Sequence, residues 1–439
     1  MLKVERRALT CLLLAVMLFF GLCYFVYKMA INGEEWTTFK GNMHIYTEGQ
    51  LNRGSIYDRN GEILIKCTKE GILYSDNAEV RKSTVHTVGD IYGNIANGLL
   101  SRKKSDLIGY NFVNGIYSPD GSGNELYLTL DAKACEAAYN ALGYNNGTVG
   151  VFNYETGEIL CLVSKPTFDP MNVPSDPEDG IFYNKFVQSK MVPGSIFKLI
   201  TAAAAIDNIK TLEEFSFDCD GSSEVEGDVI NCTYAHGTVD FKEALSKSCN
   251  GAFGELTIEL GADKMQDYVD KAGLTQSYNI NGIKTEPSSF EFPTDNNVHL
   301  AWSGIGQHND LVNPCAMMVY VGAIANGGEA VKPKLIKENK FSSDSLGSYL
   351  SKETADRIKS MMKNNVVETY GEDNYPGLDM YAKSGTAESG NGKEANAWFV
   401  GFIENQDHPY AFVVCVENGG SGSSSAGPVA RKTLESLIK

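Results

Sequence analysis

In the stretch MVPGSIFKLITAAAAID, Met191 to Asp207, the only charged side chain before the final Asp207 is Lys198, which lies in an otherwise apolar and small-residue run. Burying an ammonium group is costly unless a partner compensates for the lost water. The dipeptide Pro193-Gly194 predicts a turn into a helix that begins at Ser195, and residues i and i+3 of a helix share a face. We therefore interpret Lys198 as a functional residue that lies beside Ser195.

Apolar surroundings give this serine and lysine pair a chemical purpose. They lower the pKa of a lysine, and a neutral amine can take the proton of a serine hydroxyl. A helix N-terminus also offers free backbone N–H groups. Ser-x-x-Lys occurs at three other places, Ser101/Lys104, Ser360/Lys363 and Ser436/Lys439. Those lysines lie among charges or at the chain end, where a solvated surface lysine is the simpler interpretation.

The segments around this stretch alternate between strand and helix patterns. Residues 125–143 predict a strand and then a helix beginning near Asp131, a favourable N-cap residue, and residues 148–166 predict a hairpin. Helix patterns fill the middle of the chain. Strand patterns return at residues 380–388, 396–404 and 410–418. Strands at both ends with helices between them predict an α+β fold, an antiparallel sheet packed by helices with a helical lobe beside it.

Two further short motifs accompany the serine and lysine. SCN, Ser248 to Asn250, lies between two helix patterns, and KSGT, Lys383 to Thr386, lies on a predicted strand. Alone, SCN says little, because residues 75–77 and 277–279 also fit Ser-x-Asn, and a loop serine before a helix-capping asparagine explains it. In this order, however, the three motifs are the set found in penicillin-binding proteins and class A β-lactamases. Together they indicate a serine acyl-transfer site.

With these motifs the chain resembles the class B penicillin-binding proteins, the single-pass peptidoglycan transpeptidases. Further segments carry the resemblance: RGSIYDRNGEIL (residues 53–64), NNGTVGVFNYETGEILCLVSKPTFDP (145–170), HGTVDFKEALSKSCN (236–250), GIGQ (304–307) and AIANGG (323–328). It implies a penicillin-binding and serine β-lactamase-like transpeptidase domain over residues 124–439, a small mixed pedestal domain over 28–123 and a transmembrane anchor over 8–27. The boundary falls in the turn-rich segment 118–124.

Carried over residue by residue, the resemblance implies catalytic roles for the first two motifs. Ser195 is the nucleophile that accepts the acyl group, and Lys198 is its base. Ser248 contacts Lys198 and relays a proton to or from the leaving group. Asn250 binds an amide carbonyl of the substrate, while Cys249 between them is a small buried side chain rather than a catalyst.

The resemblance assigns substrate binding to the third motif. Lys383 attracts the substrate carboxylate by charge, helped by the hydroxyls of Ser384 and Thr386. Gly385 leaves room for a peptide to lie along the strand edge as an added strand. The backbone N–H groups of Ser195 and Thr386 form the oxyanion hole.

The implied reaction is a two-step acyl transfer on D-Ala-D-Ala stem peptides of peptidoglycan, without a cofactor. β-Lactams mimic that terminus and trap the acyl-enzyme. A D,D-carboxypeptidase, with water as acceptor, is the alternative enzyme, because residues alone do not choose between water and an amine. A β-lactam sensor or a scaffold is the non-catalytic alternative. A polytopic membrane glycosyltransferase is a further candidate partner, and division, elongation and sporulation roles all stay open.

The N-terminal residues predict the membrane anchor. Residues 8–27 form a run of twenty residues without charge, which spans roughly 30 Å, the thickness of the bilayer hydrocarbon. A cleaved signal peptide would be shorter and would end at a small-x-small site, which the residues after Tyr27 do not offer. The preceding basic residues are Lys3, Arg6 and Arg7, and Glu34 and Glu35 follow. This asymmetry predicts a single-pass protein of the cell membrane with a cytoplasmic N-terminus and an extracytoplasmic catalytic domain.

Charge and cysteine usage bound the remaining possibilities. The 439 residues carry a formal net charge of −17, which argues against a nucleic-acid partner. Of the ten cysteines, Cys219 and Cys232 flank a polar loop and are candidates for a disulfide, whose formation spacing alone does not decide. No Cys-x-x-Cys motif occurs and the six histidines are scattered. We therefore expect no metal site and no cofactor.

Overall fold

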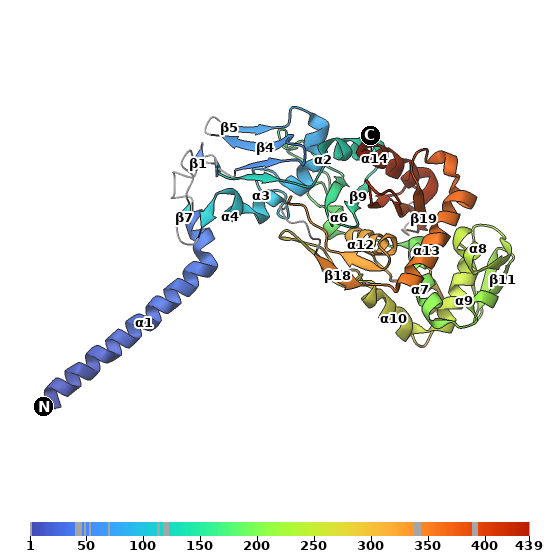
Figure 1. The fold of residues 1–439 in the computed structure, drawn as a ribbon, viewed down its shortest axis with the longest axis horizontal. Helices are drawn as coiled ribbons and strands as arrows, with labels where there is room; N and C mark the ends of the chain where they lie inside the picture. The colour runs from blue at the N-terminus through green and yellow to red at the C-terminus, as the bar shows by residue number, and fades with distance from the viewer. Residues whose placement is uncertain are drawn as a thin grey trace. The chain divides into compact units, whose positions relative to one another are not determined.

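The computed structural model describes residues 2–39, 46–47, 50–51, 54–68, 71–111, 115–116, 123–337, 344–388 and 394–438 (Figure 1). The chain forms two compact units. The first contains Met1–Ile56, Ile65–Tyr74 and Lys103–Leu126, and the second contains Tyr57–Leu64, Ser75–Arg102 and Tyr127–Lys439. Residues 118–122 of the predicted linker lie outside the described residues, so the domain limits 28–123 and 124–439 stay predictions.

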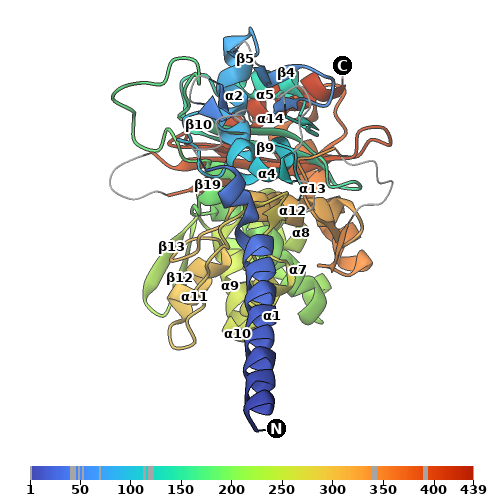
Figure 2. The same ribbon diagram turned by 90° about the vertical axis from the view of Figure 1, so that its left-hand side faces the viewer.

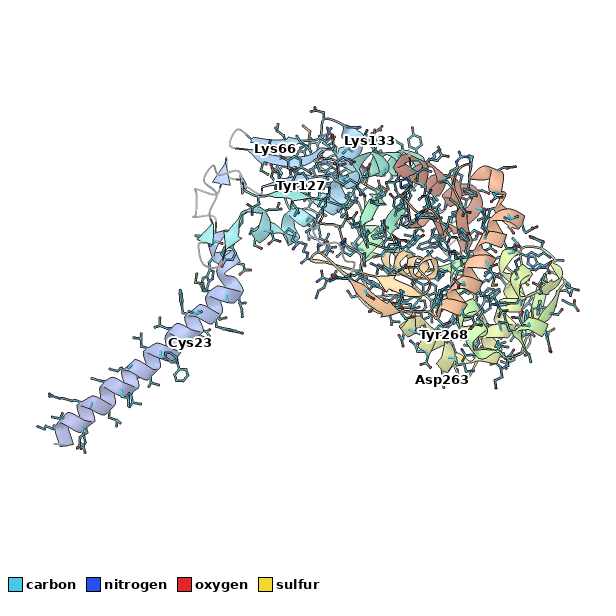
Figure 3. All side chains as sticks on the ribbon, in the orientation of Figure 1. Cys23, Lys66, Tyr127, Lys133, Asp263 and Tyr268 are labelled. Atoms are coloured by element: carbon cyan, nitrogen blue, oxygen red, sulfur yellow. The ribbon has the colours of Figure 1, made fainter. Side chains whose placement is uncertain are left out.

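The first unit begins with a long helix, α1 (Leu2–Thr37). Within it, Lys3–Gly33 is long and apolar enough to cross a membrane, and its most apolar window is not buried by the rest of the chain. Within this window the side chain of Cys23 is exposed (Figure 3). The uncharged run of residues 8–27 lies inside this helix, as a membrane anchor requires.

Most residues of the next short strands also belong to the first unit. A four-stranded sheet has the order β5-β4-β3-β8, with β3 (Ser55–Tyr57), β4 (Ile63–Thr68), β5 (Gly71–Tyr74) and β8 (Glu125–Tyr127). Two small pairs and one short helix complete it: β1 (Tyr46–Thr47) with β2 (Gln50–Leu51), β6 (Tyr110–Asn111) with β7 (Gly115–Ile116), and α4 (Lys104–Leu107).

The second unit is built on a five-stranded sheet of order β10-β9-β21-β20-β19. Its strands are β9 (Gly147–Asn153), β10 (Ile159–Lys165), β19 (Met380–Ala387), β20 (Asn396–Ile403) and β21 (Tyr410–Val416). Every neighbouring pair is antiparallel. The hairpin predicted from residues 148–166 is β9–β10, and the three late strand patterns are β19, β20 and β21. Strand β19 lies at the sheet edge, so one side of its backbone pairs with no other strand among the described residues.

Helices cover both faces of this sheet (Figure 2). On one face α2 (Ala78–Val88) and α14 (Gly427–Ile438) pack against α5 (Ala132–Leu142). Helix α5 begins where predicted, because the Asp131 side chain accepts a hydrogen bond from the Ala134 N–H. On the other face α12 (Pro314–Ala325) contacts β9, β20 and β21, and all its residues from Pro314 to Ile324 are buried. A helix that is apolar on all sides belongs in such a core.

The helical lobe lies on the same side of the sheet as α12 (Figure 2). Its helices are α7 (Lys198–Asn208), α8 (Phe241–Ser246), α9 (Asn250–Leu260), α10 (Ala262–Lys271), α11 (Asn297–Gly304) and α13 (Lys352–Asn365). Two antiparallel strand pairs join it, β11 (Ser216–Cys219) with β14 (Gly237–Asp240) and, between them in the chain, the hairpin of β12 (Ser222–Val225) and β13 (Asp228–Asn231). The smaller elements are α3 (Leu99–Arg102), α6 (Lys185–Gln188), β15 (Asn279–Ile280), β16 (Ile283–Lys284), β17 (Glu329–Val331) and β18 (Ser345–Ser348). The predicted α+β architecture is confirmed.

Candidate active site

Ser195 lies in a tight turn that precedes helix α7. The prediction that the helix begins at Ser195 was wrong by three residues: Gly194–Ile196 is a 3₁₀ turn, and α7 starts at Lys198. Such turns are common at helix N-termini. Gly194 has a φ of +54°, and a Cβ there would lie 2.6 Å from the Thr386 carbonyl oxygen. Only glycine therefore lets the serine turn approach strand β19 so closely.

Lys198 is fully buried, and its amine faces the second motif. Its Nζ donates to the Ser248 carbonyl oxygen at 2.6 Å, to Ser248 Oγ at 3.2 Å and to Asn250 Oδ1 at 2.7 Å. Burial lowers the pKa of Lys198 from 10.5 to about 7. Near neutral pH, a substantial fraction of this lysine is therefore a neutral amine with a lone pair. In the described part of the chain none of its hydrogen bonds goes to Ser195.

Ser248 lies between two buried lysines. Its Oγ is 3.2 Å from Lys198 Nζ and 3.1 Å from Lys383 Nζ. The backbone of Ser248 has a φ of +56°, in the left-handed region that costs a non-glycine residue about 1–3 kcal/mol. Burial first, and then the positive charge of Lys198, lower the pKa of Lys383 well below 10.5. The surrounding structure thus fixes one hydroxyl within reach of two amines that give up protons easily.

Asn250 opens helix α9, and its amide is bound on both sides. Oδ1 accepts from Lys198, and Nδ2 donates to the Asn231 carbonyl oxygen at 2.7 Å. Asn231 ends strand β13, so the amide connects the second motif to the β12–β13 hairpin. Asn250 is therefore oriented from both sides before any substrate arrives.

The third motif lies on the edge strand β19, close to the serine turn. A Cβ on Gly385 would lie 3.0 Å from the Pro193 carbonyl oxygen and 3.0 Å from Ile196 Cγ2. The serine turn therefore packs so tightly against the strand that a Cβ at this position would force its neighbours to shift. Room for a substrate peptide, which the resemblance implies for Gly385, stays a prediction. Thr386 next to it is exposed.

Tyr370 is a residue of this site that sequence reasoning missed. Its hydroxyl accepts from the Ser384 N–H at 2.8 Å, and Ser384 Oγ donates to it at 3.0 Å. Burial raises the pKa of Tyr370, so the phenol stays protonated. Tyr370 is one of 22 tyrosines and follows helix α13, far from any motif, so no local signal marks it. It occupies the edge N–H of Ser384, and within the motif the Thr386 N–H then faces the same edge.

The structure thus brings all three motifs together. Lys198 contacts Ser248 and Asn250, Lys383 contacts Ser248, and the turn that carries Ser195 packs on Gly385. The disulfide that the sequence left open between Cys219 and Cys232 is absent, because both are free thiols in the structure. The predicted burial of Cys249 is confirmed.

Comparison with known proteins identifies the family to which the chain belongs. The profile described as "Penicillin binding protein transpeptidase domain" matches residues 147–435. The chain belongs to the penicillin-binding protein transpeptidase family. It is 29% identical over 355 residues to Stage V sporulation protein D of Bacillus subtilis, covering 74% of this chain and 54% of that protein. It is 26% identical over 384 residues to the peptidoglycan D,D-transpeptidase PbpA of Mycobacterium tuberculosis, covering 78% of each.

Solved structures agree with this penicillin-binding protein family. The crystal structure of penicillin-binding protein A from M. tuberculosis superposes with a TM-score of 0.75 at 23% identity, over 88% of this chain and 99% of that one. Its penicillin G acyl-enzyme complex superposes with a TM-score of 0.74 at 22% identity, with the same coverage. At such identity the likeness shows the fold. The family, the fold class and the transpeptidase class of enzyme predicted from the sequence are confirmed, while the roles of single residues remain to be tested.

Proposed function

We propose that this chain is a membrane-anchored D,D-transpeptidase that cross-links peptidoglycan stem peptides through an acyl-enzyme on Ser195. The observation that carries the proposal is the buried amine of Lys198, held by the second motif with a pKa near 7. The name of the relative PbpA, peptidoglycan D,D-transpeptidase, supports the proposal, since this chain matches it over 78% of both lengths. The chain spans about half of Stage V sporulation protein D, so no sporulation role is inferred from that relative.

Acylation follows from the protonation state of Lys198. Ser195 Oγ attacks the carbonyl carbon of the penultimate D-Ala, and its proton passes to the neutral amine of Lys198. The backbone N–H groups of Ser195 and Thr386 stabilise the negative oxygen of the tetrahedral intermediate. The C–N bond then breaks, and the leaving D-Ala nitrogen receives a proton from Lys198 through Ser248 Oγ. The products are an ester on Ser195 and free D-Ala.

Deacylation reverses these roles. The amine of a neighbouring stem peptide attacks the ester carbonyl and loses a proton to Lys198, directly or through Ser248. The C–O bond breaks, and Ser195 Oγ regains a proton from Lys198. Water in place of the amine would make the chain a D,D-carboxypeptidase, and a β-lactam in place of the stem peptide would leave a stable acyl-enzyme.

Binding of the donor peptide uses the third motif and Asn250. Its terminal carboxylate lies beside Lys383, whose pKa such a charge raises again, so that the ammonium form is present in the complex. Thr386 is exposed and available to the same carboxylate, whereas Ser384 is bound to Tyr370 and would have to exchange that partner. Asn250 Nδ2 is the donor for a substrate amide carbonyl.

The anchor supports a location of this chemistry outside the cell membrane. Basic residues precede the apolar run in α1 and acidic ones follow it, which favours a cytoplasmic N-terminus. Cross-linking by the proposed reaction acts on peptidoglycan strands, which glycosyltransferases polymerise. We therefore propose a polytopic membrane glycosyltransferase as a partner.

The test is an acyl-transfer assay on the full chain in detergent. A pentapeptide ending in D-Ala-D-Ala is supplied with an added amine acceptor, and released D-Ala and the transfer product are quantified by mass spectrometry. The proposal predicts both products with wild type and with the exposed-serine control Ser175→Ala, and neither with Ser195→Ala. Release of D-Ala with hydrolysis alone would establish the carboxypeptidase, and no release at all would support the scaffold.

A further inference from the structure

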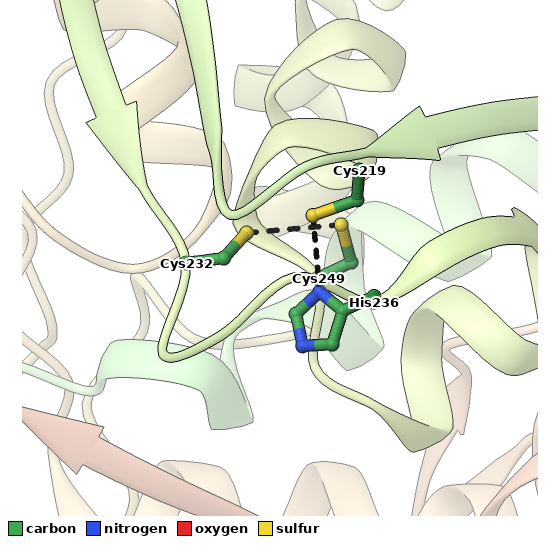
Figure 4. A group of neighbouring side chains, drawn as sticks. All are labelled: Cys219, Cys232, His236 and Cys249. Atoms are coloured by element: carbon green, nitrogen blue, oxygen red, sulfur yellow. Dashed lines mark hydrogen bonds between the residues drawn. The ribbon is translucent and has the colours of Figure 1, made fainter.

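Beside the second motif, three cysteines and one histidine converge on one point (Figure 4). Cys219 ends strand β11, Cys232 follows β13, His236 precedes β14, and Cys249 immediately precedes helix α9. They come from the two strand pairs of the helical lobe, β11–β14 and β12–β13, and from the SCN motif itself. Cys219, His236 and Cys249 are buried, and Cys232 is partly buried. The reaction described above uses none of these four side chains.

The separations match those of a tetrahedral metal centre. The three sulfurs and one imidazole nitrogen all lie within 4.8 Å of one another. Cys232 Sγ lies 3.8 Å from Cys249 Sγ, and Cys219 Sγ lies 3.2 Å from His236 Nδ1. Ligands of tetrahedral zinc lie about 3.5–3.8 Å apart, as bonds of about 2.3 Å to sulfur and 2.0 Å to nitrogen require. Small side-chain rotations therefore bring the four atoms into coordinating positions.

The chemistry of the donors selects the ion. We propose that Cys219, Cys232, His236 and Cys249 bind one zinc ion that fixes the second catalytic motif in place. Three thiolates and one imidazole form the Cys₃His set of closed structural zinc sites, whereas Mg²⁺ and Ca²⁺ prefer oxygen ligands. A disulfide would satisfy only two of the three thiols and leave the third beside the histidine. On binding, each thiol loses its proton to solvent, and neutral His236 donates its Nδ1 lone pair.

Hydrogen bonding around the cluster also fits thiolate ligands. The backbone N–H of Asn250 donates to Cys232 Sγ at 3.2 Å, a contact that stabilises a thiolate bound to a metal. His236 Nε2 is buried and finds no hydrogen-bond partner among the described side chains, so the interaction of this ring is with the sulfurs through Nδ1. The histidine is thus oriented toward the cluster and not toward another polar partner.

Zinc would act on catalysis by holding the backbone of the motif. Cys249 lies between Ser248, which has the uncommon φ of +56°, and Asn250. The Asn250 side chain donates to the carbonyl oxygen of Asn231 at the end of β13, and its backbone N–H donates to Cys232 Sγ just after that strand. One zinc ion would link both strand pairs, β11–β14 and β12–β13, to the start of α9. We class the four ligands as positioning residues, because none of them touches the reacting atoms.

This proposal departs from the expectation of no metal site. That expectation was drawn from the missing Cys-x-x-Cys motif. The ligands instead follow the spacing Cys-x₁₂-Cys-x₃-His-x₁₂-Cys. The pairing of β11 with β14 and of β12 with β13 brings these distant residues together. The short spacing of Cys232 and His236, with three residues between them, was the only local signal of a metal site.

The test measures metal directly on the full chain purified in detergent with a reductant and without chelator. Elemental analysis of wild type should give about one zinc per chain. After zinc is removed, Co²⁺ should restore one ion per chain with the strong thiolate-to-cobalt absorption. Cys219→Ala, and His236→Asn in case the first variant folds poorly, should lose affinity for zinc by at least the roughly 10–100-fold that weaker outer-shell changes cost. The matched control Cys161→Ala, a buried cysteine outside the cluster, should keep it.

Metal removal should also slow acylation by a β-lactam and lower the melting temperature of wild type, and zinc should restore both. The metal content is read without any turnover, so the zinc site and the proposed reaction fail separately. Three results would overturn the proposal: wild type that holds no zinc and takes up no cobalt, a Cys219→Ala variant that binds zinc as tightly as wild type, or a Cys219–Cys232 disulfide found by mass spectrometry under non-reducing conditions.

Discussion

Among single residues, the buried amine of Lys198 decides whether the proposed catalysis can proceed. Among the residues that the structure describes, the hydrogen-bond partners of Lys198 are the oxygens of Ser248 and Asn250, and none of them is a carboxylate. Without an acidic partner, burial determines the direction of its pKa shift, which is downward. A serine hydroxyl in the same site needs a base that is neutral at working pH, and this shift supplies one.

The pH dependence of acylation follows from that shift. The pKa of Lys198 falls from 10.5 to about 7. The reactive neutral amine therefore increases as the pH rises through 7, and the acylation rate should rise with it and level off about one unit above. Lys198→Met should fold but acylate about 10²–10⁴-fold more slowly. Rapid-mixing measurements of β-lactam acylation between pH 5.5 and 9 check both, and a flat profile or an unimpaired variant would make the lysine structural.

At the scale of elements, the site depends on how closely the serine turn approaches strand β19. Gly385→Ala would place a Cβ 3.0 Å from Pro193 O and from Ile196 Cγ2 and would push the turn outward. The neighbours must then shift by a few tenths of an ångström, less than the displacement of about 1 Å that costs up to about 10²-fold, so acylation should fall by about 10-fold. Gly254→Ala in α9, whose new methyl would lie 3.3 Å from the Ala301 methyl, is the control.

The two glycine variants are compared by the second-order rate constant of acylation and by the melting temperature. The account predicts a large loss of rate for Gly385→Ala and little change for Gly254→Ala. Equal rates for the two would mean that the serine turn and β19 accommodate the added methyl without disturbing the site, and would contradict the role of Gly385 in their packing.

Elements were predicted well where the signal is local. The turn between β9 and β10 and the cap at Asp131 are each fixed by a few neighbouring residues, and both were found from the sequence. The start of α7 was misplaced by three residues, because Gly194 at positive φ and the contact with β19 determine it, and neither is visible in the local pattern. The role of Gly385 in packing depends on the same long-range contact.

At the scale of the whole molecule, the predicted topology divides the chain at α1. An epitope tag placed before Met1 should be protected from protease in intact spheroplasts, whereas one placed after Lys439 should be removed. The physical reason is the basic flank of the apolar run, which stays in the cytoplasm. Both tags should fractionate with membranes before digestion. Protection of the C-terminal tag would contradict an extracytoplasmic catalytic domain.

Long-range assembly limited what the sequence could reveal at this scale. The three motifs extend over more than 180 residues. They were correctly grouped because their order is characteristic of a known family. The Cys219, Cys232, His236 and Cys249 cluster has no such order, and only the pairing of β11 with β14 and of β12 with β13 brings it together. Tyr370 was missed for the same reason, since its contact with Ser384 joins two elements without a shared motif.

The central claim, that Ser195 is acylated with Lys198 as its base, is tested most directly by intact mass spectrometry of the full chain in detergent during incubation with benzylpenicillin. The account predicts a long-lived penicilloyl adduct that peptide mapping locates on Ser195 and that is absent from Ser195→Ala. An adduct that persists in Ser195→Ala, or rapid turnover of the antibiotic without a lasting adduct, would contradict it.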